Sequence, residues 1–207
     1  MMDAERLKVQ ESILDRLKKE GIVAFDVNAT QQEEEAIRTV SIESEPEDFD
    51  YYGSDMAELE ALLRHHLQRI GSNSNETLDA ISKLITRTVG DMKTRFQQTS
   101  AWTTVRIFLP SDIFDAPRWH SDGHYVKDEG GEFISEEYKL EFAPKGAPTR
   151  FRNFSVKEGQ AVIYRVGERE TNAHSEPEIK TPRIFTSTIV GSHAQIEELQ
   201  RRFSSQE

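Results

Sequence analysis

The sequence contains no cysteine among its 207 residues. Disulfide bonds and thiolate metal ligands are therefore excluded, and cysteine usage gives no indication of the redox compartment. No apolar run approaches the roughly 20 residues that a membrane-spanning helix needs. The acidic start of the chain, Met1–Glu5, lacks the apolar core of a secretory signal peptide. We therefore expect a soluble, cytoplasmic protein without a membrane partner.

Basic residues are in deficit, because 26 Lys and Arg face 37 Asp and Glu, for a formal net charge of −11 at pH 7. A negative field of this size repels phosphate backbones, so we do not expect nucleic acid as a partner. Arg150 and Arg152 flank Phe151 and are compatible with a local basic groove, but two arginines are a weak signal of nucleic-acid binding. The length suits one domain, or a core with a helical extension, and is sufficient to enclose a pocket.

The first part of the chain begins with helical periodicity. Residues 2–20 predict an amphipathic helix that stops at Gly21, and Ile22–Phe25 then predicts a short buried strand. Residues 28–50 lose the periodicity and include an acidic run with a proline. We interpret them as a solvated loop, and an acidic docking tail is the alternative.

Two more helices are predicted before residue 100. The first begins near Asp55, with Asp55 and Glu58 spaced as a capping pair, and the second follows the loop Gly71–Asn75. Adjacent positions on a helix point in different directions, so His65 and His66 are expected to be surface histidines that do not share a metal ion. Both helices are expected to buttress one sheet of a core.

From Ala101 the hydrophobic period changes to two, which is typical of β-strands. Ala101–Leu109 predicts a strand with Trp102, Thr104, Arg106 and Phe108 on one side. Other predicted elements are strands at Gly159–Tyr164 and Arg183–Val190, a hairpin of Tyr138–Ala143 with Thr149–Phe154, and a last helix capped by Ser192 and Gln195.

The residues that indicate chemistry lie in two short stretches, Trp119–His124 and Asn172–Arg183. Side chains at positions i and i+2 of a strand point to the same side, so His120 and Asp122 can reach one metal ion. His174, which lies between two strand patterns, is the best candidate for a third ligand. Two imidazoles and one carboxylate leave one face of the ion open, which suits non-haem Fe(II) and also fits catalytic Zn(II).

Two features near this motif have alternative interpretations. His124 shares strand parity with His120 and Asp122, so it is a substrate contact, a group that supports a metal ligand, or a replacement for Asp122 as ligand. The charged segment Lys127–Glu137 follows the ligands directly and contains two glycines. It predicts either a lid over the site or an ordinary surface loop.

The stretch from about Trp102 to Val190 resembles the Fe(II)- and 2-oxoglutarate-dependent dioxygenases. The resemblance rests on His120-x-Asp122, the strand Gly159–Tyr164, His174 with Pro177 three residues on, and Arg183. It implies an α+β fold with a double-stranded β-helix (jelly-roll) core, supporting N-terminal helices and a short C-terminal helix. In this interpretation residues 1–100 are a mainly helical extension packed on the core, and residues 101–207 are the catalytic core.

The resemblance also implies the cofactors. His120, Asp122 and His174 would hold Fe(II), and Arg183 would pair with the distal carboxylate of 2-oxoglutarate through two parallel hydrogen bonds. Members of the family often carry Ser or Thr two residues after this arginine, where the present chain has Phe185. Ser187, on the same strand face as Arg183, is the expected substitute.

The predicted function is therefore an oxygenase that uses Fe(II), 2-oxoglutarate and O2 to hydroxylate a small molecule or a protein side chain, with succinate and CO2 as coproducts. One alternative is a cupin-like metal enzyme that does not use 2-oxoglutarate, and another is a non-enzymatic jelly-roll binding protein. The oxygenase requires Arg183 for activity, whereas the cupin-like enzyme does not. Both enzymes depend on a metal ion, whereas the binding protein does not.

Overall fold

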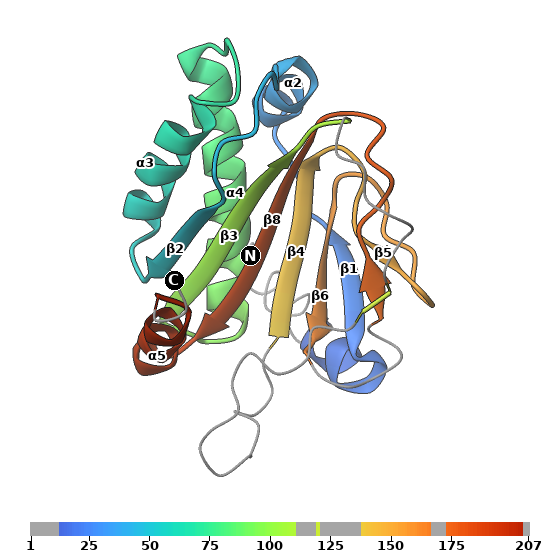
Figure 1. Cartoon of the computed structure of the whole chain (residues 1–207). Coiled ribbons are helices and arrows are strands. Elements are labelled where there is room, and N and C mark those ends of the chain that lie inside the picture. Colours follow the sequence, from blue (N-terminus) through green and yellow to red (C-terminus); the bar gives the residue numbers. More distant parts are fainter. Residues whose placement is uncertain (1–12, 111–118, 121–137, 167–172, 205–207) are drawn as a thin grey trace, which may run out of the picture.

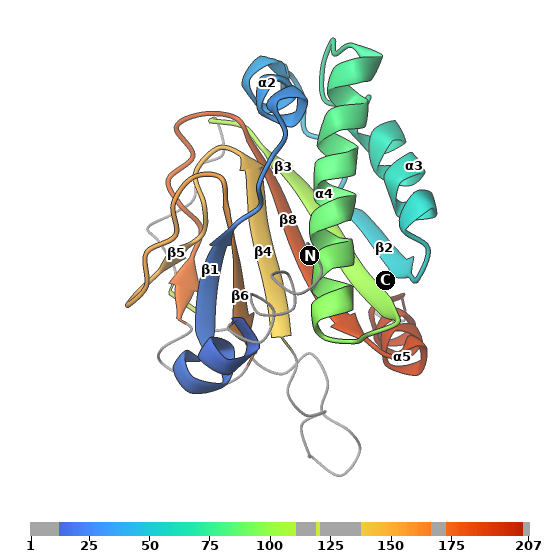
Figure 2. The same cartoon turned by 180° about the vertical axis from the view of Figure 1, so that it is seen from behind.

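The structure is a computed structural model that describes residues 13–110, 119–120, 138–166 and 173–204. In this part of the chain the fold is mixed α/β, with an antiparallel six-stranded sheet between a layer of helices and a two-stranded sheet (Figures 1 and 2). The strands are β1 (Ile22–Asp26), β2 (Phe49–Gly53), β3 (Ser100–Phe108), β4 (Tyr138–Lys145), β5 (Arg150–Phe151), β6 (Gln160–Arg165), β7 (His174–Ser175) and β8 (Arg183–Gly191).

The helices are α2 (Gln31–Thr39), α3 (Met56–Leu67), α4 (Asn75–Arg95) and α5 (His193–Ser204), and residues 13–20 are also helical. Asp55 and Ser74 cap the starts of α3 and α4, as their positions in the sequence predict. Ser192 and Gln195 exchange hydrogen bonds at the start of α5, which confirms the predicted capping box. None of the described helices is both long enough and apolar enough to cross a bilayer.

The large sheet has the order β1-β6-β4-β8-β3-β2, and α4 lies across the back of β3, β4 and β8 (Figure 2). Val105, Ile107 and Ile184 point from the sheet into the core beneath this helix. They meet the apolar stripe of α4, including Leu84 and Val89. The expectation that the long helices buttress one face of a sheet is therefore confirmed, and the opposite face is available for a site.

From β3 onward the chain alternates between the two sheets. β3, β4, β6 and β8 belong to the large sheet, whereas β5 and β7 form the small one, which His120 joins through an isolated bridge to His174. Successive described segments, in the order β3, His120, β4, β5, β6, β7 and β8, therefore lie in alternate sheets. β1 and β2, from the first hundred residues, add to opposite edges of the large sheet, and the domain boundary near residue 100 stays a prediction.

The prediction of a loop over residues 28–50 is wrong, because α2 and the start of β2 lie in this range. Thr30 and Glu33 form a reciprocal capping box at the start of α2. The helix lacks an apolar stripe because Glu33 occupies its buried face and pairs with Arg87 of α4 at 2.6 Å. The ion pair thus anchors α2 to α4, where most amphipathic helices are anchored by apolar contacts. Hydrophobic periodicity detects only helices of the second kind.

The predicted hairpin of Tyr138–Ala143 with Thr149–Phe154 is also wrong. β4 pairs with β6 and β8 in the large sheet, whereas β5 pairs with β7 in the small sheet. The intervening turn carries the chain from one sheet to the other. Alternating hydrophobicity indicates which face of a strand is buried, but it does not indicate the partner strand.

His66 corrects a third expectation, because it is buried at 6% exposure and does not lie on the surface. Its ring packs on Phe49 with centroids 5.3 Å apart. Burial lowers the pKa of His66, which favours the neutral imidazole. His65, on the other side of α3, is exposed as expected.

Candidate functional site

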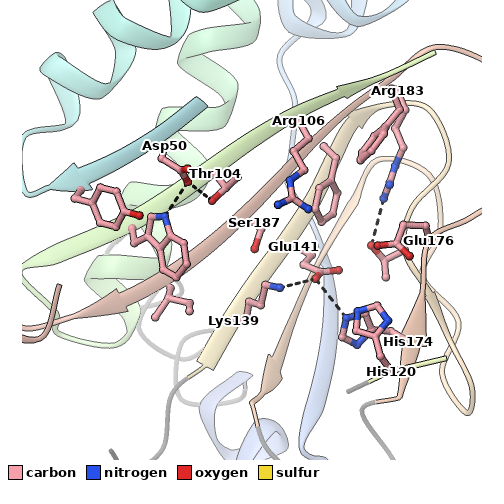
Figure 3. A pocket seen from close by; sticks show the side chains of 16 residues that line it. Asp50, Thr104, Arg106, His120, Lys139, Glu141, His174, Glu176, Arg183 and Ser187 are labelled. Atoms are coloured by element: carbon pink, nitrogen blue, oxygen red, sulfur yellow. Dashed lines mark hydrogen bonds and ion pairs between the residues drawn. The ribbon is translucent and has the colours of Figure 1, made fainter. Parts of the chain in front are cut away.

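A cavity of about 360 Å³ lies between the two sheets (Figure 3). Its floor is the face of the large sheet opposite α4, where Thr104 of β3, Ser187 of β8 and Glu141 of β4 are successive cross-strand neighbours. His120 and His174 contribute to the lining from the small sheet. The alternation of β3 therefore holds as predicted, with Trp102, Thr104, Arg106 and Phe108 all facing the cavity.

His120 and His174 lie side by side, as predicted. Each donates a backbone hydrogen bond to the other's carbonyl oxygen, at 2.9 and 2.7 Å, and their ring centroids are 4.4 Å apart. His174 is 3% exposed and packs against the rings of Phe151 and Tyr164, whereas His120 is exposed. The β-bridge thus sets one imidazole inside the cavity wall and the other at its edge.

Two imidazoles this close can each place a nitrogen about 2.1 Å from a single ion, as in zinc sites. Within the described ranges no three His, Asp or Glu side chains are arranged to hold a metal. Asp122, the predicted third ligand, lies outside those ranges, as do His124 and Lys127–Glu137. The two described histidines of the predicted set are close enough to share a metal ion, and their role as ligands stays a prediction together with the complete set.

Glu141 is a site residue that the motif analysis missed. It is 3% exposed, accepts a hydrogen bond from Tyr164 Oη at 2.8 Å, and pairs with Lys139 Nζ at 3.3 Å. Its Oε1 is also 3.9 Å from His174 Nε2 (Figure 3). A buried carboxylate needs such partners to offset its desolvation. The signal in the sequence was an acidic residue between the apolar Leu140 and Phe142, two positions after Lys139.

Arg183 lies deep in the same cavity and is only 1% exposed. Its Nη2 donates to Thr149 Oγ1 at 3.2 Å, and the guanidinium stacks on the ring of Phe185 at 4.4 Å. Among the described residues its Nε has no hydrogen-bond partner, and no carboxylate forms an ion pair with it. Burial lowers the pKa of Arg183 to about 10, although Glu141 and Glu176 oppose this shift.

Two residues near Arg183 modify the sequence-based prediction. Phe185 stacks on the guanidinium, and the hydroxyl that contacts Arg183 comes from Thr149, which motif spacing did not indicate. Ser187 faces the same cavity, four residues along β8, and the strand rise separates it from Arg183 by roughly 13 Å. A contact between Ser187 and a cosubstrate stays a prediction.

Gly146 allows the turn after β4 to pass directly over Arg183. It has φ +88°, and a Cβ at this position would lie 2.9 Å from Arg183 Cβ. We expect Gly146→Ala to reduce the free energy of unfolding by more than the about 1–2 kcal/mol that a positive φ alone costs, and urea denaturation would measure it.

Gly159→Ala is the matched control for this substitution, because Gly159 has φ +79° and a Cβ added there would meet nothing within 4 Å. The difference between the two variants isolates the close approach to Arg183. Equal losses of stability would show that the Arg183 backbone moves aside without a measurable penalty.

No protein-family model matches the sequence, and no curated protein matches it. Solved structures do resemble the fold, among them several prolyl hydroxylases. One is a prolyl-4-hydroxylase of Pseudomonas putida, with 11% identity, a TM-score of 0.46, and coverage of 88% of this chain and 98% of its own. A viral collagen prolyl hydroxylase from Paramecium Bursaria Chlorella virus-1, in complex with 2-oxoglutarate, has 12% identity, a TM-score of 0.42, and coverage of 83% and 96%.

A third is a prolyl hydroxylase from Trichoplax adhaerens in complex with a peptide of the hypoxia inducible factor oxygen degradation domain. It has 8% identity, a TM-score of 0.46, and coverage of 96% of this chain and 95% of its own. Because these TM-scores are all below 0.5, the function rests on the geometry of the site itself.

Proposed function

We propose that the protein is an Fe(II)- and 2-oxoglutarate-dependent oxygenase that hydroxylates an organic substrate. His120, Asp122 and His174 would hold the iron, and Arg183 would bind the distal carboxylate of 2-oxoglutarate. The observation that carries the proposal is the buried guanidinium of Arg183, whose Nε has no hydrogen-bond partner among the described residues, in the cavity that also contains two adjacent imidazoles.

The guanidinium requires an anion on physical grounds. A buried charge is costly unless it is paired, and Arg183 has five N–H donors but one hydrogen bond to a described residue. A carboxylate fits the planar fork with two parallel hydrogen bonds. Thr149 holds one arm of the fork and Phe185 stacks on its face, so the donor plane is fixed before a ligand arrives.

The strand arrangement supports the double-stranded β-helix interpretation of the core. Consecutive segments from β3 to β8 alternate between two sheets, with the His120 segment, β5 and β7 in the small one. Such alternation is expected when a double strand winds into two facing sheets. It places His120 and His174 on one sheet and Arg183 on the other, with the cavity between them.

The side chains around the histidines orient and shield the proposed centre. Phe151 and Tyr164 pack against His174, which fixes its ring and keeps water from that side. A bound Fe(II) would supply the redox chemistry that couples the conversion of 2-oxoglutarate and dioxygen into succinate and carbon dioxide to oxidation of the substrate. The protein holds the reacting groups in place and limits access of solvent.

Glu141 is expected to position His174. Glu141→Gln keeps the size of the side chain and its bond to Tyr164 but removes the negative charge beside His174 Nε2. We expect metal affinity or turnover to fall by about 10- to 100-fold, as for other groups that orient metal ligands. Titration with Mn(II) would measure the affinity. Unchanged affinity and turnover would show that Glu141 serves only to balance Lys139.

Turnover of 2-oxoglutarate tests the proposed function. The purified protein would be incubated with Fe(II), ascorbate, air and 2-oxoglutarate, and succinate would be quantified. We expect succinate that requires both Fe(II) and air and that is absent with Asp122→Ala. Metal binding without any consumption of 2-oxoglutarate would favour a cupin-like enzyme of another kind, and the absence of metal binding would favour a binding protein.

A further inference from the structure

The cavity extends away from the histidines and Arg183 to the edge strand of the large sheet. Asp50 and Tyr52 of β2 and Trp102 and Thr104 of β3 line this part, the β2 end of the cavity (Figure 3). The proposed oxygenase chemistry uses none of these four residues. Their side chains nevertheless converge on one place.

Asp50 is held in a fixed orientation without being neutralised. Its Oδ1 accepts hydrogen bonds from Trp102 Nε1 at 2.9 Å and from Thr104 Oγ1 at 2.6 Å. Asp50 is exposed to the cavity, and it forms no ion pair with the residues that the structure describes. Because both donors use one oxygen, Oδ2 keeps its capacity to accept from a ligand.

The cations near this end are already compensated. Arg106, two residues along β3 from Thr104, pairs with Asp48 at 2.9 Å. Lys139, in the same cross-strand row as Trp102, pairs with Glu141 at 3.3 Å. Neither is available to neutralise Asp50, so among the residues that the structure describes the β2 end presents a negative charge to a ligand.

An aromatic wall accompanies this charge. The rings of Tyr52 and Trp102 stack with centroids 5.4 Å apart and planes 12° apart, and both remain partly exposed. Both rings also pack against a cluster formed by Ile189 of β8 with Ile196 and Leu199 of α5, which supports the wall. A carboxylate beside an electron-rich indole is a combination that attracts organic cations.

We propose that the β2 end of the cavity binds an alkylammonium group of the primary substrate, with the charge at Asp50 and the adjoining methylene groups against Trp102. This inference rests on the proposed function in one respect, which is that the bound group belongs to the substrate of the oxygenase. Binding itself depends on Asp50 and Trp102, which are separate from the predicted metal ligands and Arg183.

The register of the sheet also sets the length of such a substrate. Asp50, Thr104, Ser187 and Glu141 are successive cross-strand neighbours, so Asp50 and Glu141 are separated by three interstrand spacings, or about 14 Å. His174 lies next to Glu141. A substrate that reaches from Asp50 to the histidines therefore resembles a polyamine or a peptide with a lysine side chain, and a free α-amino acid is too short.

Tryptophan fluorescence provides the test, because the chain has only two tryptophans, Trp102 and Trp119. In a Trp119→Phe background, Trp102 is the only indole. This protein, free of metal and 2-oxoglutarate, would be titrated with spermidine, with a short lysine peptide, and with the same peptide acetylated on the lysine. We expect a saturable change in emission with an amine, and none with the acetylated peptide.

Asp50→Asn, added to this background, keeps the oxygen that accepts from Trp102 and removes the charge. We expect it to raise the Kd for the amine at least about tenfold, since each tenfold corresponds to about 1.4 kcal/mol. Glu34→Gln, the same change of charge on the exposed face of α2, is the matched control and should shift the Kd less than about twofold.

The outcomes separate the sources of the amine and the two proposals. Binding of spermidine alone supports a polyamine, and binding of the peptide alone supports a lysine side chain. Equal binding of the acetylated peptide, equal binding by Asp50→Asn, or no saturable change with either amine overturns the inference. Amine binding by a protein that fails to turn over 2-oxoglutarate supports the β2-end site and counts against the oxygenase.

Discussion

Replacing Arg183 with methionine is expected to weaken the binding of 2-oxoglutarate at least about 30-fold. Removing one partner of a buried, hydrogen-bonded charge pair costs about 2–5 kcal/mol, and 1.4 kcal/mol corresponds to a factor of ten. Isothermal titration of the metal-loaded protein would measure the loss. Arg106→Met is the matched control, because Arg106 lines the same cavity but is exposed and already paired with Asp48.

The same substitution should leave the ligand-free protein about as stable as before. Among the described residues Arg183 has one hydrogen-bond partner and no ion-pair partner for its buried charge, so methionine removes an unfavourable desolvation together with one contact. We expect the free energy of unfolding to fall by less than about 1 kcal/mol or to rise. A large loss of stability together with unchanged 2-oxoglutarate binding would show that Arg183 is a structural residue.

His174→Ala is expected to reduce metal affinity more than about 100-fold and to abolish turnover. Changes to groups that merely orient a metal ligand already cost about 10- to 100-fold, so removal of a ligand should cost more. Mn(II), which does not oxidise readily, is a suitable probe for the titration.

His66→Ala provides the control for loss of a buried imidazole. His66 is 6% exposed and His174 is 3% exposed, and both pack on aromatic rings. Each substitution should lower stability by about 0.5–3 kcal/mol, but only His174→Ala should change metal affinity. Equal metal affinity in the two variants would remove His174 from the metal site.

The parts of the site that follow from strand parity were predictable from the sequence. Alternation in β3 and β8 assigned Trp102, Arg183 and Ser187 to one side of their strands, and all three line the cavity. Placing His120 next to His174 required more than parity, because the two belong to strands more than fifty residues apart. The position of His174 between two strand patterns made it the best candidate, and the resemblance to a known family indicated the same residue.

Other features depend on contacts that local pattern does not contain. Helix α2 was not predicted because its buried face carries Glu33, which pairs with Arg87 of α4, more than fifty residues away. The contact of Thr149 with Arg183 was not predicted because it forms only after the chain crosses between sheets. The place of Glu141 in the site was not predicted because its contacts, Tyr164 and His174, come from two other strands. In each case a polar residue is stabilised by a distant partner, and hydrophobic periodicity does not register it.

The most direct measurement is metal-dependent binding of 2-oxoglutarate. The anaerobic protein would be loaded with Fe(II), and the weak visible metal-to-ligand band would be sought as 2-oxoglutarate is added. We predict a band in the wild-type protein that is lost in Asp122→Ala and weakened in Arg183→Met. Stable binding of Fe(II) with no band at saturating 2-oxoglutarate would contradict the assignment of the cosubstrate. Failure to bind any metal would contradict the proposal that the protein is an enzyme of this kind.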